Sequence, residues 1–200
     1  MEILIATTNK GKFTEMMEVL GDLPHQFFSL NDLNITLDVD EAGLTYAENA
    51  LLKAEQYYEV GNMPTIGEDS GIVVDALAGE LGIHTRRWGA RPKASDAKWI
   101  EYFLNRMQEF PDNRTASFIS TAVFYAPNHI PEHQTFIGET KGRITHQLEA
   151  PLVHGIPISS CFIPNTADKV YSALTTAEKN QISHRGKAMH QLKSFLCQLN

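Results

Sequence analysis

The chain has 200 residues, of which 42% are hydrophobic and 20% charged, and its formal net charge at pH 7 is −7. This composition is typical of a globular protein with a sizeable core, and the acidic balance argues against non-specific binding to nucleic acid or to a membrane surface, which requires a basic stripe. No apolar run approaches the ~20 residues of a membrane span, and the two cysteines form neither a metal-binding pattern nor a disulfide framework. We therefore expect one domain over residues 1–200, located in the cytoplasm, with no nucleic-acid or membrane partner.

The first half of the chain alternates predicted strands and helices. Continuous apolar residues are typical of a strand buried on both faces of a sheet, and apolar residues at helical spacing predict a helix. Thr45, with Glu48 three residues later, predicts a capping box at the start of one helix. A later strand is expected to end at an acidic site formed by Glu68 and Asp69. The predicted elements are a strand at 3–6, a helix ending at Gly21, strands near 26–30 and 34–37, a helix from Thr45 and a strand at 64–67.

The second half contains an antiparallel-looking pair of strands. Alternating aromatic and β-branched residues predict these strands, and a periodic apolar stripe predicts a closing helix. Trp99, Tyr102 and Phe103 are interpreted as core residues rather than as a stacking platform. Together the two halves indicate an α/β fold with a mixed central sheet and two lobes around a cleft. The predicted elements are a helix at 95–108, strands at 115–126 and 135–145, a loop with a short strand over 149–165 and a helix with its stripe at 188–199.

A polar loop, Thr7-Thr8-Asn9-Lys10-Gly11-Lys12, separates the first predicted strand from the first predicted helix. The start of a helix offers free backbone N–H groups and the positive end of the helix dipole. With a hydroxyl, an amide and two ammonium groups added, this loop is a candidate phosphate-binding site, although it lacks the spacing of a Walker loop. The alternative is a solvated loop in which Asn9 caps the helix, and the sequence favours neither interpretation.

Two acidic clusters are candidates for metal binding, one at Asp38, Asp40 and Glu41 and the other at Glu68 and Asp69. Adjacent carboxylates repel one another unless a cation or a raised pKa relieves them. Oxygen ligands without His or Cys favour Mg²⁺ or Mn²⁺ over Zn²⁺, and such an ion would link the carboxylates to a triphosphate. The alternative is an exposed acidic turn. That alternative is favoured for either cluster alone, and the two interpretations are balanced when both clusters and the phosphate-type loop are considered.

The segment from Lys179 to Lys187 holds three cations and His184 inside an acidic protein. Arg185 can bind an anion or a base edge bidentately, and each ring nitrogen of His184 can donate. The alternative is a basic start of the last helix, where cations oppose the helix dipole. That mismatch favours an anion-binding site.

Four ordered blocks of the sequence together resemble a known family. They are Thr7-x-Asn9-x-Gly11-Lys12, then Gly43 to Ala54 (GLTYAENALLKA), then Glu68-Asp69-Ser70-Gly71-Ile72, and Lys179 followed by Ile182-Ser183-His184-Arg185. Over almost the full length, the chain resembles the inosine triphosphate pyrophosphatase family. The resemblance implies a two-lobed mixed α/β fold around a nucleotide-binding cleft, usually as a homodimer. It also implies Mg²⁺-dependent hydrolysis of ITP, dITP and XTP to the monophosphate and pyrophosphate, with Mn²⁺ as a second candidate ion.

The resemblance assigns roles to individual residues as well. Asp69 looks like the catalytic carboxylate, either as a metal ligand or as the base for the attacking water. Glu41 is similar to the metal carboxylate of the family, and Glu68 stands beside Asp69 as a further ligand. The residues that the resemblance assigns to substrate binding are Thr7, Asn9, Lys12, Ser70, Lys179, His184 and Arg185, the last two as readers of the 6-keto edge of the purine.

One block of the family is altered in this chain. The family usually has Gly-Phe-Gly-Tyr-Asp-Pro, whose aromatic residue packs on the base, whereas the corresponding segment here begins Val153-His154-Gly155-Ile156-Pro157. His154 and Gly155 stand where Phe-Gly would and are expected to contact substrate, but the Tyr and the Asp are absent. Phosphate hydrolysis is expected to survive this change, because the phosphate and metal blocks remain. Two alternatives stay open, namely the same chemistry on a different base and a catalytically weak nucleotide-binding protein.

Overall fold

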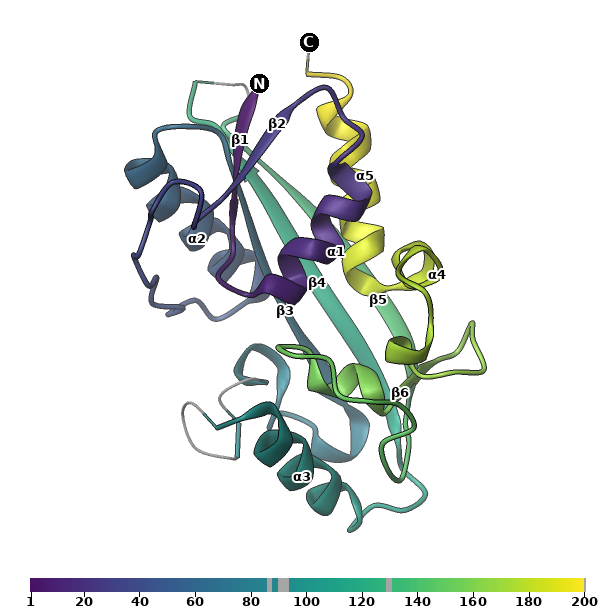
Figure 1. Cartoon of the computed structure of the whole chain (residues 1–200). Coiled ribbons are helices and arrows are strands. Elements are labelled where there is room, and N and C mark those ends of the chain that lie inside the picture. Colours follow the sequence, from purple (N-terminus) through teal and green to yellow (C-terminus); the bar gives the residue numbers. More distant parts are fainter. Residues whose placement is uncertain (86–87, 90–93, 129–130, 200) are drawn as a thin grey trace.

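The computed structural model of the chain describes residues 1–85, 88–89, 94–128 and 131–199 (Figure 1). Within these residues, six strands form one mixed sheet in the order β2-β1-β3-β4-β5-β6. The strands are β1 (Glu2–Ala6), β2 (Gln26–Ser29), β3 (Thr65–Val74), β4 (Thr115–Tyr125), β5 (His133–Ile144) and β6 (Phe162–Pro164). The α-helices are α1 (Lys10–Leu20), α2 (Tyr46–Gly61), α3 (Asp96–Met107), α4 (Thr176–Ile182) and α5 (His184–Leu196). In the described ranges, no helix has the length and apolar character needed to cross a bilayer.

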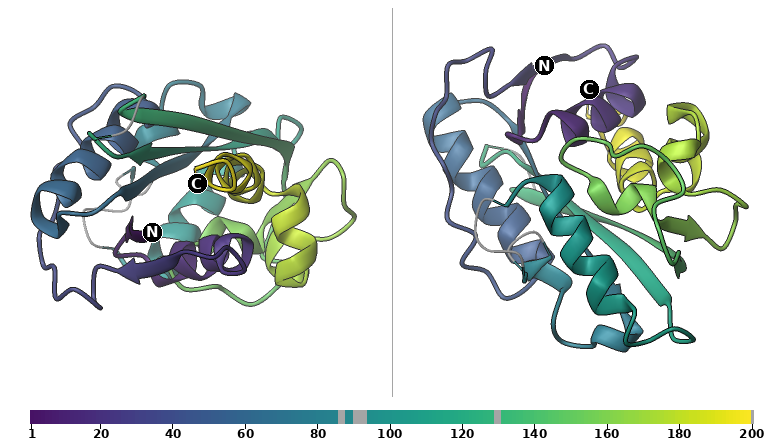
Figure 2. Two further views of the ribbon diagram at one scale, coloured as in Figure 1. Left: turned by 90° about the horizontal axis from the view of Figure 1, so that it is seen from above. Right: turned by 60° about the horizontal axis from the view of Figure 1, so that its bottom comes forward.

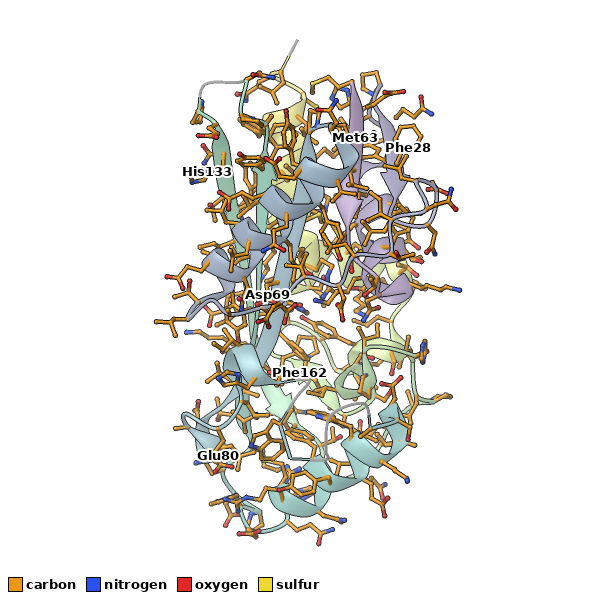
Figure 3. All side chains as sticks on the ribbon, turned by 90° about the vertical axis from the view of Figure 1, so that its left-hand side faces the viewer. Phe28, Met63, Asp69, Glu80, His133 and Phe162 are labelled. Atoms are coloured by element: carbon orange, nitrogen blue, oxygen red, sulfur yellow. The ribbon has the colours of Figure 1, made fainter. Side chains whose placement is uncertain are left out.

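Three long strands connect the two ends of the molecule. β1 pairs in parallel with β2 and with β3, whereas β3, β4, β5 and β6 pair antiparallel in succession. β3, β4 and β5 continue into the lower part of the molecule, where α3 lies (Figure 1). Figure 3 places Asp69 of β3 between the two ends, with Met63 and Phe28 towards one end and Glu80 and Phe162 towards the other.

The helices cover both faces of the upper sheet. Val123 of β4 clusters with Ala50 of α2, whereas Phe124 belongs to the core formed with β1, α1 and α5. Because successive strand residues point to opposite faces, α2 covers one face and α1 and α5 cover the other (Figure 2). A Cβ at Gly67 of β3 would collide with the carbonyl of Ala50. The glycine therefore allows α2 to pack directly on the strand.

Two hydrophobic clusters fill the two lobes. The upper cluster contains Ile66 of β3, and the lower cluster, which contains Ile72 of the same strand, gathers around Trp99 and Phe103 of α3. The polar residues 68–70 therefore lie at the boundary between the lobes. The predicted mixed α/β fold with two lobes around a cleft is confirmed, as is the assignment of Trp99 and Phe103 to the core. The assignment of Tyr102 to the core is wrong, because its side chain is exposed.

Three local predictions differ from the structure. Residues 34–37 form no strand, because Asn34 adopts a left-handed conformation with a φ of 54°. The acidic pair lies within β3 rather than at a strand end, because β4 pairs with β3 throughout this segment. The basic segment contains the additional helix α4, which is too short for apolar periodicity to reveal. Ser183 ends α4 and caps α5, and the other predicted elements are confirmed.

Candidate active site

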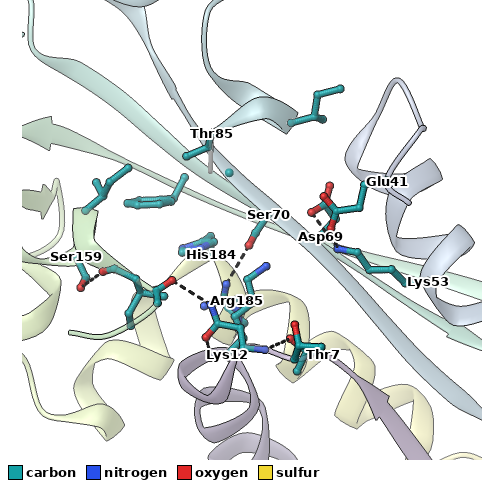
Figure 4. Close-up of a pocket in the computed structure, with 18 of the residues that line it drawn as sticks. Thr7, Lys12, Glu41, Lys53, Asp69, Ser70, Thr85, Ser159, His184 and Arg185 are labelled. Carbon is teal, nitrogen blue, oxygen red and sulfur yellow. Dashed lines mark hydrogen bonds and ion pairs between the residues drawn. The ribbon is translucent and has the colours of Figure 1, made fainter. Parts of the chain in front are cut away.

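A cavity of about 350 Å³ opens between the lobes, at the middle of β3 (Figure 4). Its wall contains every residue predicted for the site except Glu68 and His154. The cavity thus gathers segments that lie far apart in the sequence, at both ends of the chain and in its middle. The predicted residues that line it are Thr7, Asn9, Lys12, Glu41, Asp69, Ser70, Gly155, Lys179, His184 and Arg185.

The start of α1 faces this cavity. Oδ1 of Asn9 accepts a hydrogen bond from the backbone N–H of Lys12 at 3.1 Å, and Oγ1 of Thr7 accepts from the backbone N–H of Asn9 at 3.2 Å. Nδ2 of Asn9 donates to the carbonyl oxygen of Gly155 at 3.0 Å. Asn9 therefore caps the helix, as one interpretation of the sequence held. The cap fixes the loop while other N–H groups of the first turn stay available for an anion, so the two interpretations do not exclude one another.

The loop that carries Gly155 is held by α3. Oδ2 of Asp96 accepts a hydrogen bond from the backbone N–H of Gly155 at 2.8 Å and lies 3.0 Å from Nδ1 of His154. Gly155 has a φ of +79°, a conformation that favours glycine. The side chain of His154 is 95% exposed. The structure therefore brings Gly155 to the site but not His154. The ring of His154 points away from the cavity into solvent, with Nδ1 beside Asp96.

On the α2 side of β3, two carboxylates converge on one lysine. Nζ of Lys53 lies 2.5 Å from Oε1 of Glu41 and 3.3 Å from Oδ1 of Asp69. Asn49, one turn before Lys53, donates from Nδ2 to Oδ2 of Asp69 at 3.2 Å. Burial, helped by the charges of Glu41 and Glu68, raises the pKa of Asp69 above its ordinary value although the charges of Lys53 and Lys12 lower it. A carboxyl group with a raised pKa in a cavity is suited to exchanging a proton.

This pair of carboxylates also fits a hard divalent cation. In nucleotide enzymes Mg²⁺ is usually held by one or two carboxylates and completes its shell with phosphate oxygens and water. Glu41 and Asp69 already share one cation, the ammonium group of Lys53. No group of three His, Cys, Asp or Glu side chains suited to a metal occurs among the described residues, and a site completed by substrate phosphates needs none.

Glu68 lies on the opposite face of β3 from Asp69, because consecutive strand residues alternate between faces. Its Oε2 lies 2.9 Å from Nζ of Lys12, and its Oε1 accepts from Oγ of Ser120 at 2.7 Å and from Nε of Arg185 at 3.2 Å. Burial raises the pKa of Glu68, but the charges of Arg185 and Lys12 outweigh this and hold the pKa well below its ordinary value. The structure therefore does not place Glu68 beside Asp69 as a metal ligand.

A second buried carboxylate, Glu15 of α1, belongs to the same group of charges. It forms ion pairs with both Lys179 of α4 and Arg185 of α5. Nη2 of Arg185 also donates to Oγ of Ser70 at 3.0 Å, so the guanidinium is bound through all three of its nitrogens. These charges tie three helices to the sheet. The buried ion network, as we call it, consists of Lys12, Glu15, Glu68, Lys179 and Arg185.

His184 contributes an uncharged polar ring to the cavity wall (Figure 4). The ring stacks on Phe118, with centroids 4.6 Å apart and an interplanar angle of 14°. Burial, followed by the charge of Arg185, lowers the pKa of His184 well below its ordinary value. Nδ1 of this ring has no hydrogen-bond partner among the described residues. A neutral imidazole has one donor and one acceptor nitrogen, so His184 can match either kind of ligand atom.

Lys53 and Glu15 belong to the site although no sequence pattern predicted a role for either residue. Both lie on helix faces that pack inward, Lys53 one turn after the buried Asn49 and Glu15 beside the buried Met16. A charged residue in a buried stripe is a signal that sequence alone offers, because such residues are rarely buried without a partner. The partners themselves come from distant segments, and only the tertiary structure identifies them.

The chain matches the model of the Ham1 family over residues 3–195. It is 38% identical to a protein of Oceanobacillus iheyensis named dITP/XTP pyrophosphatase, over 98% of each sequence, and equally similar to a protein of that name from Haemophilus influenzae. Among solved structures, a HAM1 protein from Coxiella burnetii gives a TM-score of 0.84 at 29% identity, over 98% of each chain. The Staphylococcus aureus Ham1 protein gives a TM-score of 0.82 at 32% identity, over 100% of each chain.

Proposed function

Because the chain belongs to the Ham1 family, we propose that it hydrolyses the non-standard purine nucleoside triphosphates ITP, dITP and XTP to the monophosphate and pyrophosphate. The observation that carries this proposal is the full-length similarity to dITP/XTP pyrophosphatases. It agrees with the resemblance to inosine triphosphate pyrophosphatases found in the four sequence blocks, which is confirmed. The alternatives of another base or of a catalytically weak binding protein are not favoured.

The triphosphate is proposed to bind between the start of α1 and the carboxylates of β3. Thr7, Asn9 and Lys12 surround the free N–H groups of α1 and would contact phosphate oxygens. Glu41 and Asp69 would hold a divalent cation, for which we propose Mg²⁺, and the bound ion would neutralise phosphate charge. Phosphoryl transfer depends mainly on such neutralisation and on positioning.

Asp69 is proposed as the catalytic carboxylate. The reaction needs a water molecule placed in line with the departing pyrophosphate, and a carboxylate of raised pKa can orient that water and accept its proton. Asn49 and Lys53 bind the two oxygens of Asp69 separately, which fixes the plane of the carboxylate. We assign these two side chains to positioning Asp69.

His184 is proposed to contact the base. Arg185 is bound by Glu15, Glu68 and Ser70, so the unpartnered Nδ1 of the neighbouring His184 is the better placed polar atom. A donor that faces the 6-position of a purine pairs with a keto oxygen and is left unpaired by an amino group. The remaining candidates for substrate contact in the cavity wall are Ser70, Gly155, Lys179 and Arg185.

Pyrophosphate release from a panel of triphosphates, with and without Mg²⁺ or Mn²⁺, tests the proposed function. We expect metal-dependent release from ITP, dITP and XTP. The kcat/KM for these substrates should be at least about a hundredfold higher than that for ATP, and GTP should also be a poor substrate. Faster release from a different nucleotide would keep the proposed chemistry but assign a different substrate. Tight nucleotide binding without any pyrophosphate release would instead indicate a binding protein.

The contact between Asp96 and Gly155 gives a prediction about KM. We expect Asp96→Ala to raise KM for ITP by about fivefold with a smaller change in kcat, because the freed Gly155 no longer fixes Asn9 in the phosphate-binding loop. Asp96→Asn is the matched control, since its amide oxygen can still accept from Gly155. Steady-state kinetics measure both variants. A wild-type KM in Asp96→Ala would show that the loop needs no support from α3.

A homodimer in the cytoplasm is part of the proposal. Both cysteines are free, Cys161 buried and Cys197 exposed, which suits a reducing compartment. The proposal of a dimer is based on the family resemblance. Light scattering tests it, because a monomer has a mass of 22.4 kDa and the proposed dimer has twice that mass.

A further inference from the structure

One residue of the cavity wall carries a buried donor that has no partner among the described residues. Trp99 lies on α3 three residues after Asp96, and thus on the helix face that also holds the Gly155 loop. Its side chain lines the cavity and is only 2% exposed. Its indole Nε1 has no hydrogen-bond acceptor among the described residues. Since buried donors are almost always paired in native proteins, an acceptor supplied by a ligand is the simplest partner for this one.

The indole of Trp99 can offer a ligand only its edge. Phe103 stacks on the ring, with centroids 5.4 Å apart and an interplanar angle of 14°, and Trp88 packs edge-on at 6.5 Å. These contacts hold the ring in the lower hydrophobic cluster and prevent its rotation towards another partner. Trp99 is therefore a fixed N–H donor and not a stacking platform.

The surroundings of Trp99 suit a purine ring better than a phosphate. Ile158 and Phe118 also line the cavity and pack in the same lower cluster. The cations of the cavity, in contrast, come from upper-lobe helices, for example Lys12 from α1 and Lys53 from α2. A ligand pocket with an apolar wall and a few placed polar atoms is typical of base recognition.

We propose that Trp99 selects the base by donating its indole N–H to a carbonyl oxygen of the purine. This inference rests on the proposed function and adds a specificity-determining residue to it. The indole N–H is a donor only. It therefore pairs with O6 of hypoxanthine or xanthine, or with O2 of xanthine, and is left without an acceptor by the 6-amino group of adenine. In this chain, which lacks the Tyr and Asp of the usual family block, Trp99 supplies part of the base recognition.

The variant Trp99→Phe tests the donor, because it keeps an aromatic ring and removes the N–H. We expect kcat/KM for ITP or XTP to fall about tenfold, while inhibition by inorganic tripolyphosphate, which has no base, is unchanged. Trp88→Phe is the matched control. Trp88 contacts Trp99 but does not line the cavity, so its kcat/KM should stay within about twofold of wild type.

The outcomes separate the donor from a structural role. A fall confined to XTP assigns the bond to O2, and an equal fall on both substrates assigns it to O6, and either result supports the proposal. Equal kcat/KM in the two variants overturns it, as does a parallel loss of tripolyphosphate inhibition. If the wild-type protein releases no pyrophosphate from ITP or XTP, the proposed function fails. The contact between Trp99 and the base is then tested by nucleotide binding.

Binding can be read from the same indole. The chain has two tryptophans, so Trp88→Phe leaves Trp99 as the remaining indole emitter. We expect IMP and XMP to change the emission of this variant and tripolyphosphate to leave it unchanged. Unchanged emission at concentrations that saturate IMP or XMP binding in calorimetry would overturn the proposal, whether or not the protein turns over triphosphates.

Discussion

Asp69→Asn is expected to lower kcat for ITP and XTP by about a thousandfold, with the fold and most of the nucleotide affinity intact. Asparagine has nearly the shape of aspartate but neither its charge nor its basicity. The loss is therefore expected whether Asp69 accepts a proton from water or holds the metal ion. Pyrophosphate release, thermal unfolding and calorimetric binding of ITP without metal measure the three quantities.

Asp75→Asn is the matched control for this variant, because Asp75 is exposed just beyond the end of β3. Its turnover should equal that of wild type. The concentration of Mg²⁺ that gives half-maximal activity separates the two roles of Asp69. A large increase in that concentration for Asp69→Asn identifies a metal ligand, and an unchanged value identifies a base. Undiminished turnover would remove Asp69 from the mechanism.

Arg185→Ala is expected to lower the free energy of unfolding by about 3–5 kcal/mol. The guanidinium is 3% exposed and pairs with both Glu15 and Glu68, so its removal leaves two buried carboxylates with reduced compensation. Urea unfolding measures the effect. Arg143→Ala, on the exposed side of β5, is the matched control and should change the free energy by no more than about 0.5 kcal/mol.

A second substitution distinguishes lost charge balance from lost packing. Arg185→Met removes the charge but keeps an unbranched side chain that can pack in the same place, so its free energy of unfolding should fall nearly as far as that of Arg185→Ala. Recovery of most of the lost stability in Arg185→Met would show that the packing of the arginine side chain matters more than its charge. If the free energy of unfolding of Arg185→Ala falls by less than about 1 kcal/mol, the buried ion network contributes no more than an exposed ion pair does, and its importance is contradicted.

The parts of the site formed within one short segment were predictable from the sequence. Asn9 caps α1 and Thr45 caps α2, as their local patterns predict. The predicted capping box is incomplete, because Oε2 of Glu48 accepts from the backbone N–H of Leu44 and not of Thr45. For both caps the information lies in residues a few positions apart, and helix capping depends on just such local contacts. The central position of Asp69, in contrast, was expected from the family resemblance.

The orientation of Glu68 and His154 depended on structure that the sequence does not reveal. Glu68 appeared as a partner of Asp69 because a strand was expected to end there. The strand instead continues through both residues alongside β4, and its alternation separates the two side chains. His154 was placed by analogy with an aromatic residue, but the contact with Asp96 turns its ring outward. Register and long-range contacts decided both cases.

Glu68 and Asp69 are neighbours in the sequence but lie on opposite faces of β3. Glu68 belongs to the ion network that holds α1 and α5 on one face of β3, whereas Asp69, the proposed catalytic carboxylate, pairs with Lys53 on the other face. The loop around Gly155 belongs to neither set of charges. Side-chain changes in that loop can therefore retune which base is accepted, provided that the backbone contacts of Gly155 with Asn9 and Asp96 are kept. The altered block of this chain is the kind of divergence that such an arrangement tolerates.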